Sequence, residues 1–491
     1  MQFLEGFRHL DAGDGSYDTG VGQARRPGLK IVGVASTVAL GGFLVGFDAT
    51  VIAGAVPFIR DYFGLGGGGL GGDAGSLKLG WAVSSLGWGA MAGNLMAGML
   101  SDRFGRKKLL LLTSLLFLAS ALTAALSTSF TVFVMARICG GLGVGAAILT
   151  APVYIAEIAP ARARGSLVSL NQLMIVIGIS ISFFSNYFLV SLGPESWRWM
   201  LGVQVIPAAL YFLLLILVPE SPRWLLSKRR EQSALAVLTQ VHGSAAAQRE
   251  LADIQASLVS KPRQFAVREL LAGRLRRVLI FGLGIAFFQQ ATGINAVFYY
   301  LPTIFAQAGG GLSTAFGQSV FVGLVNVGMT FVAIWLIDRL GRKPLLCVGV
   351  AGMTLSLLSI SWAFYTAHAS VGGEPAVTHG TVVLVAIAAF VASFAISLGP
   401  VMWVLLAEIF PNEERAAAIS AVGFWNSLVS ASVTLLFPKE LASWGPAGIF
   451  LAYGLIAAAG LLFILMLAPE TKGKTLEELE QMLVRPKQVV G

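Results

Sequence analysis

The sequence predicts an all-helical membrane protein with twelve transmembrane helices in two halves of six. The chain of 491 residues is 56% hydrophobic and only 12% charged, whereas soluble domains carry about 25% charged residues. Apolar runs of about 20 residues, the length that crosses a bilayer as a helix, can be placed twelve times. Three motifs also occur twice in the same order, which indicates a duplicated unit.

Short polar segments separate the predicted helices, except for one long polar segment in the middle of the chain. The predicted spans are 29–58, 79–101, 107–128, 131–155, 166–190, 198–218, 276–302, 316–338, 343–366, 380–408, 414–437 and 445–467. Only helices or closed barrels satisfy backbone hydrogen bonds in lipid, and continuous apolar runs exclude a barrel. The predicted parts are a tail (1–28), a first half (29–218), linker helices (219–275), a second half (276–467) and a tail (468–491).

The basic residues predict how the chain is oriented. With both termini placed in the cytoplasm, 29 of the 34 Lys and Arg residues fall on cytoplasmic segments, as the positive-inside rule requires. The net charge of +9 is therefore interpreted as a topology signal, and nucleic-acid binding is not expected. The expected location is the cell membrane, specifically a bacterial inner membrane.

The repeated motifs predict a gate at the cytoplasmic helix ends. Asp102-Arg-Phe-Gly-Arg106-Lys recurs, as Asp-Arg-Leu-Gly-Arg-Lys, 236 residues later. Glu157-Ile-Ala-Pro recurs, as Glu-Ile-Phe-Pro, after 251 residues, and Pro219-Glu-Ser recurs, as Pro-Glu-Thr, after 250 residues. Acidic and basic side chains at helix ends can pair with one another and with helix dipoles, so such pairs can form when the halves close and break when they part. The predicted gate residues are Asp102, Arg103, Arg106, Glu157, Arg164, Asp338, Arg339, Arg342, Glu408 and Arg415.

Six motifs distributed along the chain occur together. They are Gly98-Met-Leu-Ser-Asp-Arg-Phe-Gly-Arg-Lys107, Arg137 followed by Gly140-Gly-Leu-Gly-Val-Gly145, Pro219-Glu-Ser-Pro-Arg-Trp224, Gln289-Gln-Ala-Thr-Gly-Ile-Asn295, Gly399-Pro-Val-Met-Trp403 and Pro469-Glu-Thr-Lys-Gly473. With these motifs, nearly all of residues 29–475 resembles the sugar porters of the major facilitator superfamily. The resemblance implies a transporter that works by alternating access, without covalent chemistry.

Two ionisable residues lie deep within predicted membrane helices. Charges in the membrane interior are costly and are functional candidates, and an Asp48–Arg137 pair would be a natural proton switch. In proton-coupled sugar porters, matching residues are taken to couple transport to protons, and many facilitative relatives have a neutral residue in place of the Asp. The alternative is a static ion pair that fixes helix packing.

Amide and aromatic side chains at mid-membrane depth predict a sugar site, since a sugar needs several hydrogen-bonding groups and an aromatic face. Amides can also join helices in membranes, but the family resemblance favours binding. Phe424 and Ile179 stand where similar pentose transporters carry Gln, which favours a hexose. The predicted sugar-binding residues are Gln172, Gln289, Gln290, Asn295, Asn326, Trp403 and Trp425, with Asn426 beside the last.

The sequence predicts a monosaccharide:proton symporter that acts as a monomer within the lipid bilayer. A facilitative uniporter, a polyol or inositol carrier and a sugar sensor remain alternatives. The two cysteines and four histidines lack metal-ligand spacing, and the chain has no phosphate-loop or Ser/His/Asp pattern. No metal, cofactor or enzymatic activity is expected.

Overall fold

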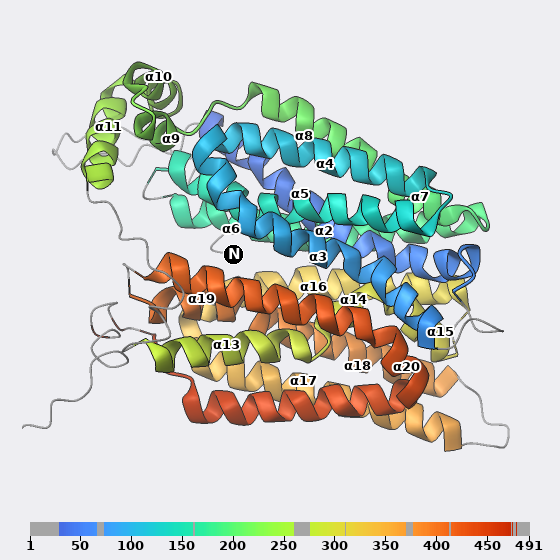
Figure 1. Ribbon diagram of the computed structural model, residues 1–491. Coiled ribbons are helices and arrows are strands. Elements are labelled where there is room, and N and C mark those ends of the chain that lie inside the picture. Colours follow the sequence, from blue (N-terminus) through green and yellow to red (C-terminus); the bar gives the residue numbers. More distant parts are fainter. Residues whose placement is uncertain are drawn as a thin grey trace, which may run out of the picture.

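The computed structural model is a bundle of long helices arranged in two halves (Figure 1). It describes residues 29–65, 73–160, 163–259, 275–309, 311–369, 377–411, 414–472, 474 and 478. The predicted N-terminal tail, most of the predicted C-terminal tail and the end of the predicted linker lie outside the described residues.

The first half contains six membrane-spanning segments, the last of which is interrupted. These are α2 (Leu29–Tyr62), α3 (Asp73–Phe104), α4 (Arg106–Leu126), α5 (Phe130–Ile158), α6 (Arg164–Leu189) and the pair α7 (Ser196–Gly202) and α8 (Val205–Leu217), with a 3-10 turn η1 (Val190–Leu192) before α7. Gly105 separates α3 from α4 with a φ of 105°. Glycine adopts this conformation without strain, so the chain can reverse within one residue.

The second half repeats this plan with more interruptions. Its segments are α13 (Arg276–Ala291) with α14 (Ile294–Tyr299) and α15 (Leu301–Gln307), α16 (Leu312–Leu340), α17 (Arg342–Ala369), α18 (Val377–Ile396) with α19 (Leu398–Ile409), and α20 (Arg415–Leu467). Gly341 repeats the reversal of the first half with a φ of 95°. Gly445 interrupts α20 with a φ of 67°, and Figure 1 shows the sharp bend in this helix.

The described helices confirm the predicted number of spans. Ten of them, counting interrupted segments once, are long and apolar enough to cross a membrane. The 32-residue α3 is not among these ten, and α20 is counted once although its 53 residues bend in the middle. Adding α3 and the second part of α20 gives twelve spanning segments in the described part of the chain.

Three short helices connect the two halves in the sequence, and they lie at one end of the bundle (Figure 1). They are α9 (Pro222–Ser227), α10 (Glu231–His242) and α11 (Ser244–Val259). Trp224, Leu238 and Leu251 lie in a small apolar core of their own, as predicted for amphipathic linker helices. We call this end of the bundle the linker side and the opposite end the far side.

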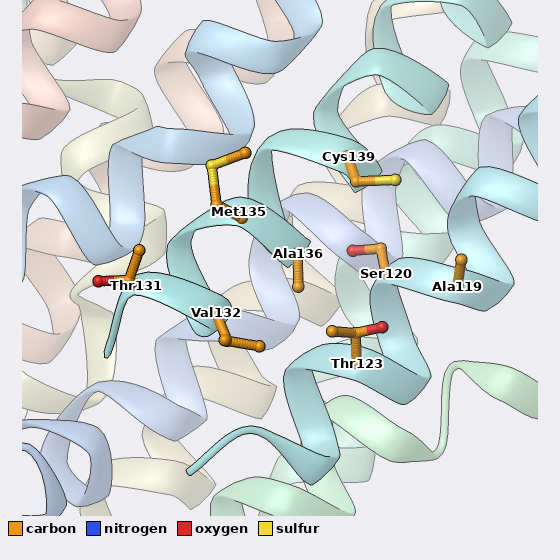
Figure 2. Close-up of a pocket in the computed structure, with 8 residues that line it drawn as sticks. All are labelled: Ala119, Ser120, Thr123, Thr131, Val132, Met135, Ala136 and Cys139. Carbon is orange, nitrogen blue, oxygen red and sulfur yellow. The ribbon is translucent and has the colours of Figure 1, made fainter. Parts of the chain in front are cut away.

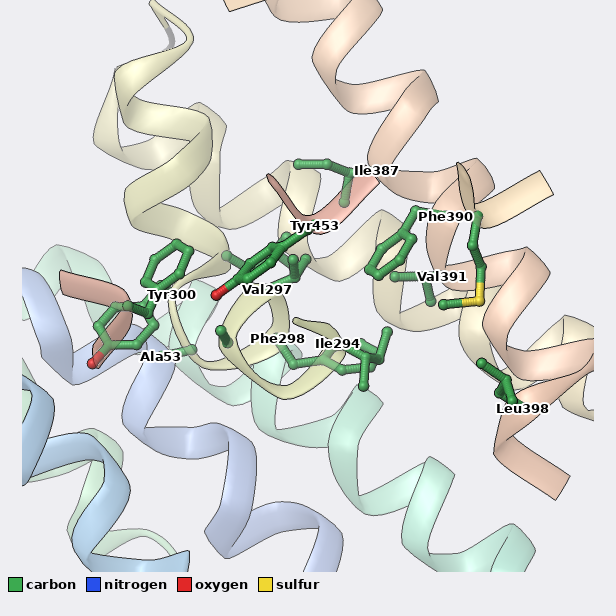
Figure 3. Packing of buried hydrophobic residues seen from close by; sticks show 14 of the residues in the cluster. Ala53, Ile294, Val297, Phe298, Tyr300, Ile387, Phe390, Val391, Leu398 and Tyr453 are labelled. Carbon is green, nitrogen blue, oxygen red and sulfur yellow. The ribbon is translucent and has the colours of Figure 1, made fainter. Parts of the chain in front are cut away.

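The largest cluster of buried apolar side chains extends across both halves. Figure 3 shows it around the short helix α14, with Ala53 of α2 on one side and Phe390 and Val391 of α18 on the other. Phe183 of α6 also stacks on Phe298 of α14, with ring centroids 6.3 Å apart. The two halves therefore share one core where α14 meets the first half.

Candidate functional site

Asp48 of α2 and Arg137 of α5 form an ion pair inside the first half, where each side chain is 1% exposed. Arg137 Nη1 donates to Asp48 Oδ1, and Nη2 donates to the backbone oxygen of Asp48 at 3.0 Å. A buried charge without a partner costs several kcal/mol, and pairing offsets this cost. Within the described part of the chain, Asp48 Oδ2 has no hydrogen-bond partner, so this carboxylate keeps an oxygen that can take a proton.

A helix break places amide side chains in the second half. Gly293 lies between α13 and α14 with a φ of 82°, and a Cβ there would overlap the ring of Tyr453. Only glycine fits both the conformation and the space. The break leaves Gln289 and Gln290 at the end of α13 and Asn295 in the first turn of α14.

Four amide side chains bond to one another at this break, and we call them the amide cluster: Gln289, Gln290, Asn295 and Asn426. Gln290 Nε2 donates to Gln289 Oε1 at 3.1 Å and to Asn426 Oδ1 at 3.2 Å. Asn426 Nδ2 donates to Gln289 Oε1 at 2.7 Å, and Asn295 Nδ2 donates to Gln290 Oε1 at 2.9 Å. Each amide therefore fixes the rotation of its neighbours.

The amide cluster also connects four helices that meet at the break. Gln289 Nε2 donates at 2.7 Å to the oxygen of Leu398, the first residue of α19. Asn295 Nδ2 donates to Ser430 Oγ of α20, also at 2.7 Å. The cluster thus joins both sides of the break in α13–α14 to α19 and α20.

At the linker side, three of the predicted gate residues of the first half pair with one another. Arg106 Nη1 lies 3.0 Å from Asp102 Oδ1, and Arg106 Nε lies 3.0 Å from Glu157 Oε2. Ser221 Oγ donates to Glu157 Oε2 at 2.5 Å. The repeated motifs of this half thus meet in one network.

The second half contains the same network with equivalent residues. Arg342 Nη2 lies 2.8 Å from Glu408 Oε1, and Thr471 Oγ1 donates to Glu408 Oε2 at 2.5 Å. The side chain of Asp338 lies outside the described part of the chain. The described ion pairs of the gate all join residues of the same half.

The other predicted gate residues lie at the edges of these networks. Arg103 and Arg339 are exposed, and their guanidinium groups lie 5.3 Å and 4.0 Å from the ring centroids of Phe104 and Trp335. Arg164 is exposed as well. Arg415 and Arg164 are at the starts of equivalent helices, α20 and α6, and Arg415 Nε donates to a backbone oxygen of its own half.

On the far side, contacts join the two halves. Lys439 Nζ of α20 lies 3.3 Å from Asp73 Oδ2 of α3, and α2 packs against α14 and α15. The ion pairs described for Arg106 and Arg342 lie within their own halves, whereas the Lys439–Asp73 pair joins the two halves on the far side.

Comparison with known proteins identifies the family. The family model described as sugar (and other) transporter matches residues 34–483. The chain belongs to the sugar porter family of the major facilitator superfamily. It is a transporter rather than an enzyme, as predicted.

Several sugar porters are similar over nearly their whole length. The chain is 36% identical over 463 residues to the arabinose-proton symporter of Bacillus subtilis. This alignment covers 93% of this chain and 95% of that protein. It is 39% identical over 468 residues to the glucose transport protein of Synechocystis, and this alignment covers 92% of this chain and 96% of that protein. The fold matches the inward open conformation of the xylose transporter XylE from E. coli with a TM-score of 0.79 and 34% sequence identity. This match covers 92% of this chain and 100% of that chain.

The structure joins some of the predicted sugar residues of this sugar porter and leaves others apart. Gln289, Gln290 and Asn295 bond directly. The remaining four have no side-chain hydrogen bond to the amide cluster in the described part of the chain: Gln172, Asn326, Trp403 and Trp425. Trp403 and Trp425 are 41% and 36% exposed, whereas Asn326 is buried.

Two kinds of residue were given too little weight in the predicted site. Asn426 bonds to both glutamines of the amide cluster, but it was named only as the neighbour of Trp425. Glu220 and Glu470 belong to the gate networks, and the repeat at an offset of 250 residues was the signal for them. Helix periodicity does not show which amide on α20 faces α13.

A cavity of about 300 Å³ lies between α4 and α5. Figure 2 shows Ser120 and Thr123 on one wall and Met135 and Cys139 on the other. Its lining includes no residue that was predicted to bind sugar or to form the gate. The candidate site of this sugar porter is therefore the amide cluster together with the Asp48–Arg137 pair.

Proposed function

We propose that the chain imports a monosaccharide, a hexose, together with protons by alternating access. The observation that carries this proposal is the buried Asp48–Arg137 pair in a member of the sugar porter family. Relatives named as arabinose-proton and D-xylose-proton symporters support proton coupling. The relative named as a glucose transport protein supports a hexose.

Protonation of Asp48 is the coupling step of this proposal. It removes the charge that balances Arg137, which is then left 1% exposed without its counter-ion. An unpaired buried cation is strongly unfavourable, so Arg137 must move or find other acceptors. Because the pair joins α2 to α5, this movement changes how these two helices pack and permits the loaded carrier to reorient.

The sugar binds, in this proposal, between the amide cluster and the exposed side chains that accompany it. The amides supply hydrogen bonds, and Trp403 and Trp425 supply apolar ring faces. Phe424 is 37% exposed and adds a further apolar surface beside them. Gln172 and Asn326 complete the site from α6 and α16 once the halves approach each other.

The linker side is the cytoplasmic side in this proposal, because most of the basic residues are located there. Both tails, 1–28 and 468–491, are then cytoplasmic. The protein itself lies in the inner membrane of a bacterium. The present conformation is open on the cytoplasmic side in this proposal, because the fold matches the inward open conformation of XylE. The gate residues pair between the halves only when the linker side closes, and one monomer is the functional unit.

Sugar-dependent proton uptake tests the proposal. Addition of D-glucose to weakly buffered vesicles should make the external medium more alkaline, and Asp48→Asn should abolish accumulation while exchange continues. Sugar uptake without alkalinisation would identify a facilitative uniporter. Preference for inositol over hexoses would identify a polyol carrier, and binding with negligible flux would identify a sensor.

A further inference from the structure

Asn426 contacts both glutamines of the amide cluster with its side chain. Its Oδ1 accepts from Gln290, and its Nδ2 donates to Gln289 Oε1 and, at 3.2 Å, to the backbone oxygen of Ala286. The side chain is 7% exposed, and those of Gln289 and Gln290 are 3% and 8% exposed. Asn426 therefore sets the direction in which both glutamine amides point.

The N–H groups of the amide cluster are almost all committed to the protein. A primary amide has two N–H donors and one carbonyl acceptor. Both N–H groups of Gln290 and both of Asn295 have protein acceptors, and so do both of Asn426. Gln289 donates to Leu398 and keeps one N–H. An amide oxygen can accept two hydrogen bonds. Gln289 Oε1 already accepts two, whereas Gln290 Oε1 and Asn426 Oδ1 each accept one and can accept another.

We propose that Asn426 is a positioning residue that makes the sugar site accept hydrogen bonds from the substrate rather than donate them. Asn426 accepts from Gln290 and so directs an N–H group of Gln290 into the protein. It also donates to Gln289 Oε1 and so holds the Gln289 amide in the orientation that bonds to Leu398. Sugar hydroxyl groups then bind the cluster mainly as donors. This inference rests on the proposed sugar site and adds the direction of its hydrogen bonds.

Deoxy and fluoro sugars distinguish the two directions. A fluorine in place of a hydroxyl can accept a hydrogen bond but cannot donate one, and a deoxy sugar can do neither. At a hydroxyl that acts as a donor, both replacements remove the same hydrogen bond. At a hydroxyl that acts as an acceptor, fluorine restores part of the affinity.

Removal of Asn426 should reverse the pattern. Asn426→Leu keeps a similar side-chain volume but removes the acceptor of one Gln290 N–H and the donor to Gln289 Oε1. A buried N–H without a partner is unfavourable. Rotation of the Gln290 amide, so that this N–H donates to the substrate, therefore becomes favourable. Fluoro sugars should then bind better than the matching deoxy sugars.

The test is competition for D-glucose counterflow in proteoliposomes, with monodeoxy and monofluoro glucoses that cover each hydroxyl in turn. In the wild type, at the hydroxyls whose loss weakens binding, we expect the two replacements to inhibit equally. In Asn426→Leu, fluoro sugars should inhibit about 3-fold to 10-fold better than deoxy sugars at one or more of these positions. Asn426→Ala provides a second variant if the leucine variant does not fold.

Asn186→Leu is the matched control. Asn186 of α6 is also a buried amide, and it donates to the backbone oxygen of Val51 at 3.1 Å, within the first half. Its loss should leave the wild-type pattern unchanged.

Two results would overturn the role of Asn426. One is that fluorine already restores affinity in the wild type. The other is that both Asn426 variants show normal glucose counterflow with the wild-type pattern. A wild type without saturable glucose counterflow would instead overturn the proposed hexose function.

Discussion

Glu220 and Glu470 occupy equivalent places in the two halves, and each carboxylate accepts the backbone N–H groups that begin a membrane helix. Glu220 Oε1 accepts from the first two residues of α4, each at 3.0 Å, and Glu470 accepts from the first two residues of α17 at 3.2 and 3.1 Å. A helix N-terminus has unpaired N–H groups and a partial positive charge. Each acid therefore joins the segment that follows the last helix of its half to the turn between the second and third spans of that half.

We expect Glu220→Gln to destabilise the protein by about 1 to 2 kcal/mol, because it removes the charge from hydrogen bonds at a helix N-terminus. The measurement is the melting temperature in detergent. Asp253→Asn is the control, since Asp253 is an exposed acid on α11. Equal melting temperatures for the two variants would contradict a structural role for Glu220.

The contribution of Glu470 should depend on pH. Burial raises the pKa of Glu470, but hydrogen bonds from the backbone N–H groups of Lys472, Arg342, Lys343 and Thr471 outweigh it, so the pKa is lowered from 4.5. A carboxylate whose folded pKa is lowered stabilises the fold above its ordinary pKa and loses this effect as the pH falls through the folded value.

The difference in melting temperature between the wild type and Glu470→Gln should therefore be constant from neutral pH down to about pH 5. It should shrink as the pH falls below 4.5. A difference that instead shrinks between neutral pH and pH 5 would show that the pKa of Glu470 is raised.

The sequence was sufficient for the number of helices, since apolar length predicted the twelve spans, including α3. The duplicated motifs predicted that acidic and basic side chains at helix ends pair, and the structure pairs Arg106 with Glu157 and Arg342 with Glu408. Their role as a gate stays a prediction. The sequence could not show whether these acids pair within a half or between halves. That choice depends on the conformation of the carrier, which a linear pattern does not contain.

The site was predictable only in part, for a similar reason. Motif resemblance identified Gln289, Gln290 and Asn295, and two isolated charges identified the Asp48–Arg137 pair. The contact of Asn426 with both glutamines depends on how α20 is rotated against α13. In a membrane helix that is apolar all round, hydrophobic periodicity carries little information about rotation.

Arg198 should stabilise the far side of the first half. Its Nη1 donates to the backbone oxygens of Ala125 and Ser127 at 2.8 and 2.7 Å, and its guanidinium lies 4.3 Å and 5.0 Å from the ring centroids of Trp197 and Tyr62. Arg198→Ala leaves two carbonyl groups at the end of α4 without this donor, and we expect a loss of about 2 to 3 kcal/mol.

Thermal unfolding in detergent measures this loss. Lys78→Ala is the control, because Lys78 is an exposed basic residue on the same side. A variant Arg198→Ala that melts together with the control would show that these contacts contribute nothing measurable.

A disulfide between the halves should hold the transporter in the present conformation. A Cβ on Gly87 of α3 would lie 3.4 Å from the Cβ of Ala431 on α20, close to the range of about 3.5 to 4.5 Å that disulfides require. We expect Gly87→Cys with Ala431→Cys to crosslink on oxidation, in a background where Cys139 and Cys347 are replaced by Ser.

Because α3 and α20 belong to different halves, the crosslink prevents them from separating on the far side. Sugar transport should therefore stop on oxidation and return on reduction with dithiothreitol, whereas each single-cysteine variant should transport under both conditions. Gel mobility or mass spectrometry verifies that the bond has formed. Full transport by the oxidised, crosslinked protein would show that these two helices do not part during the cycle, and that the halves reorient by another movement.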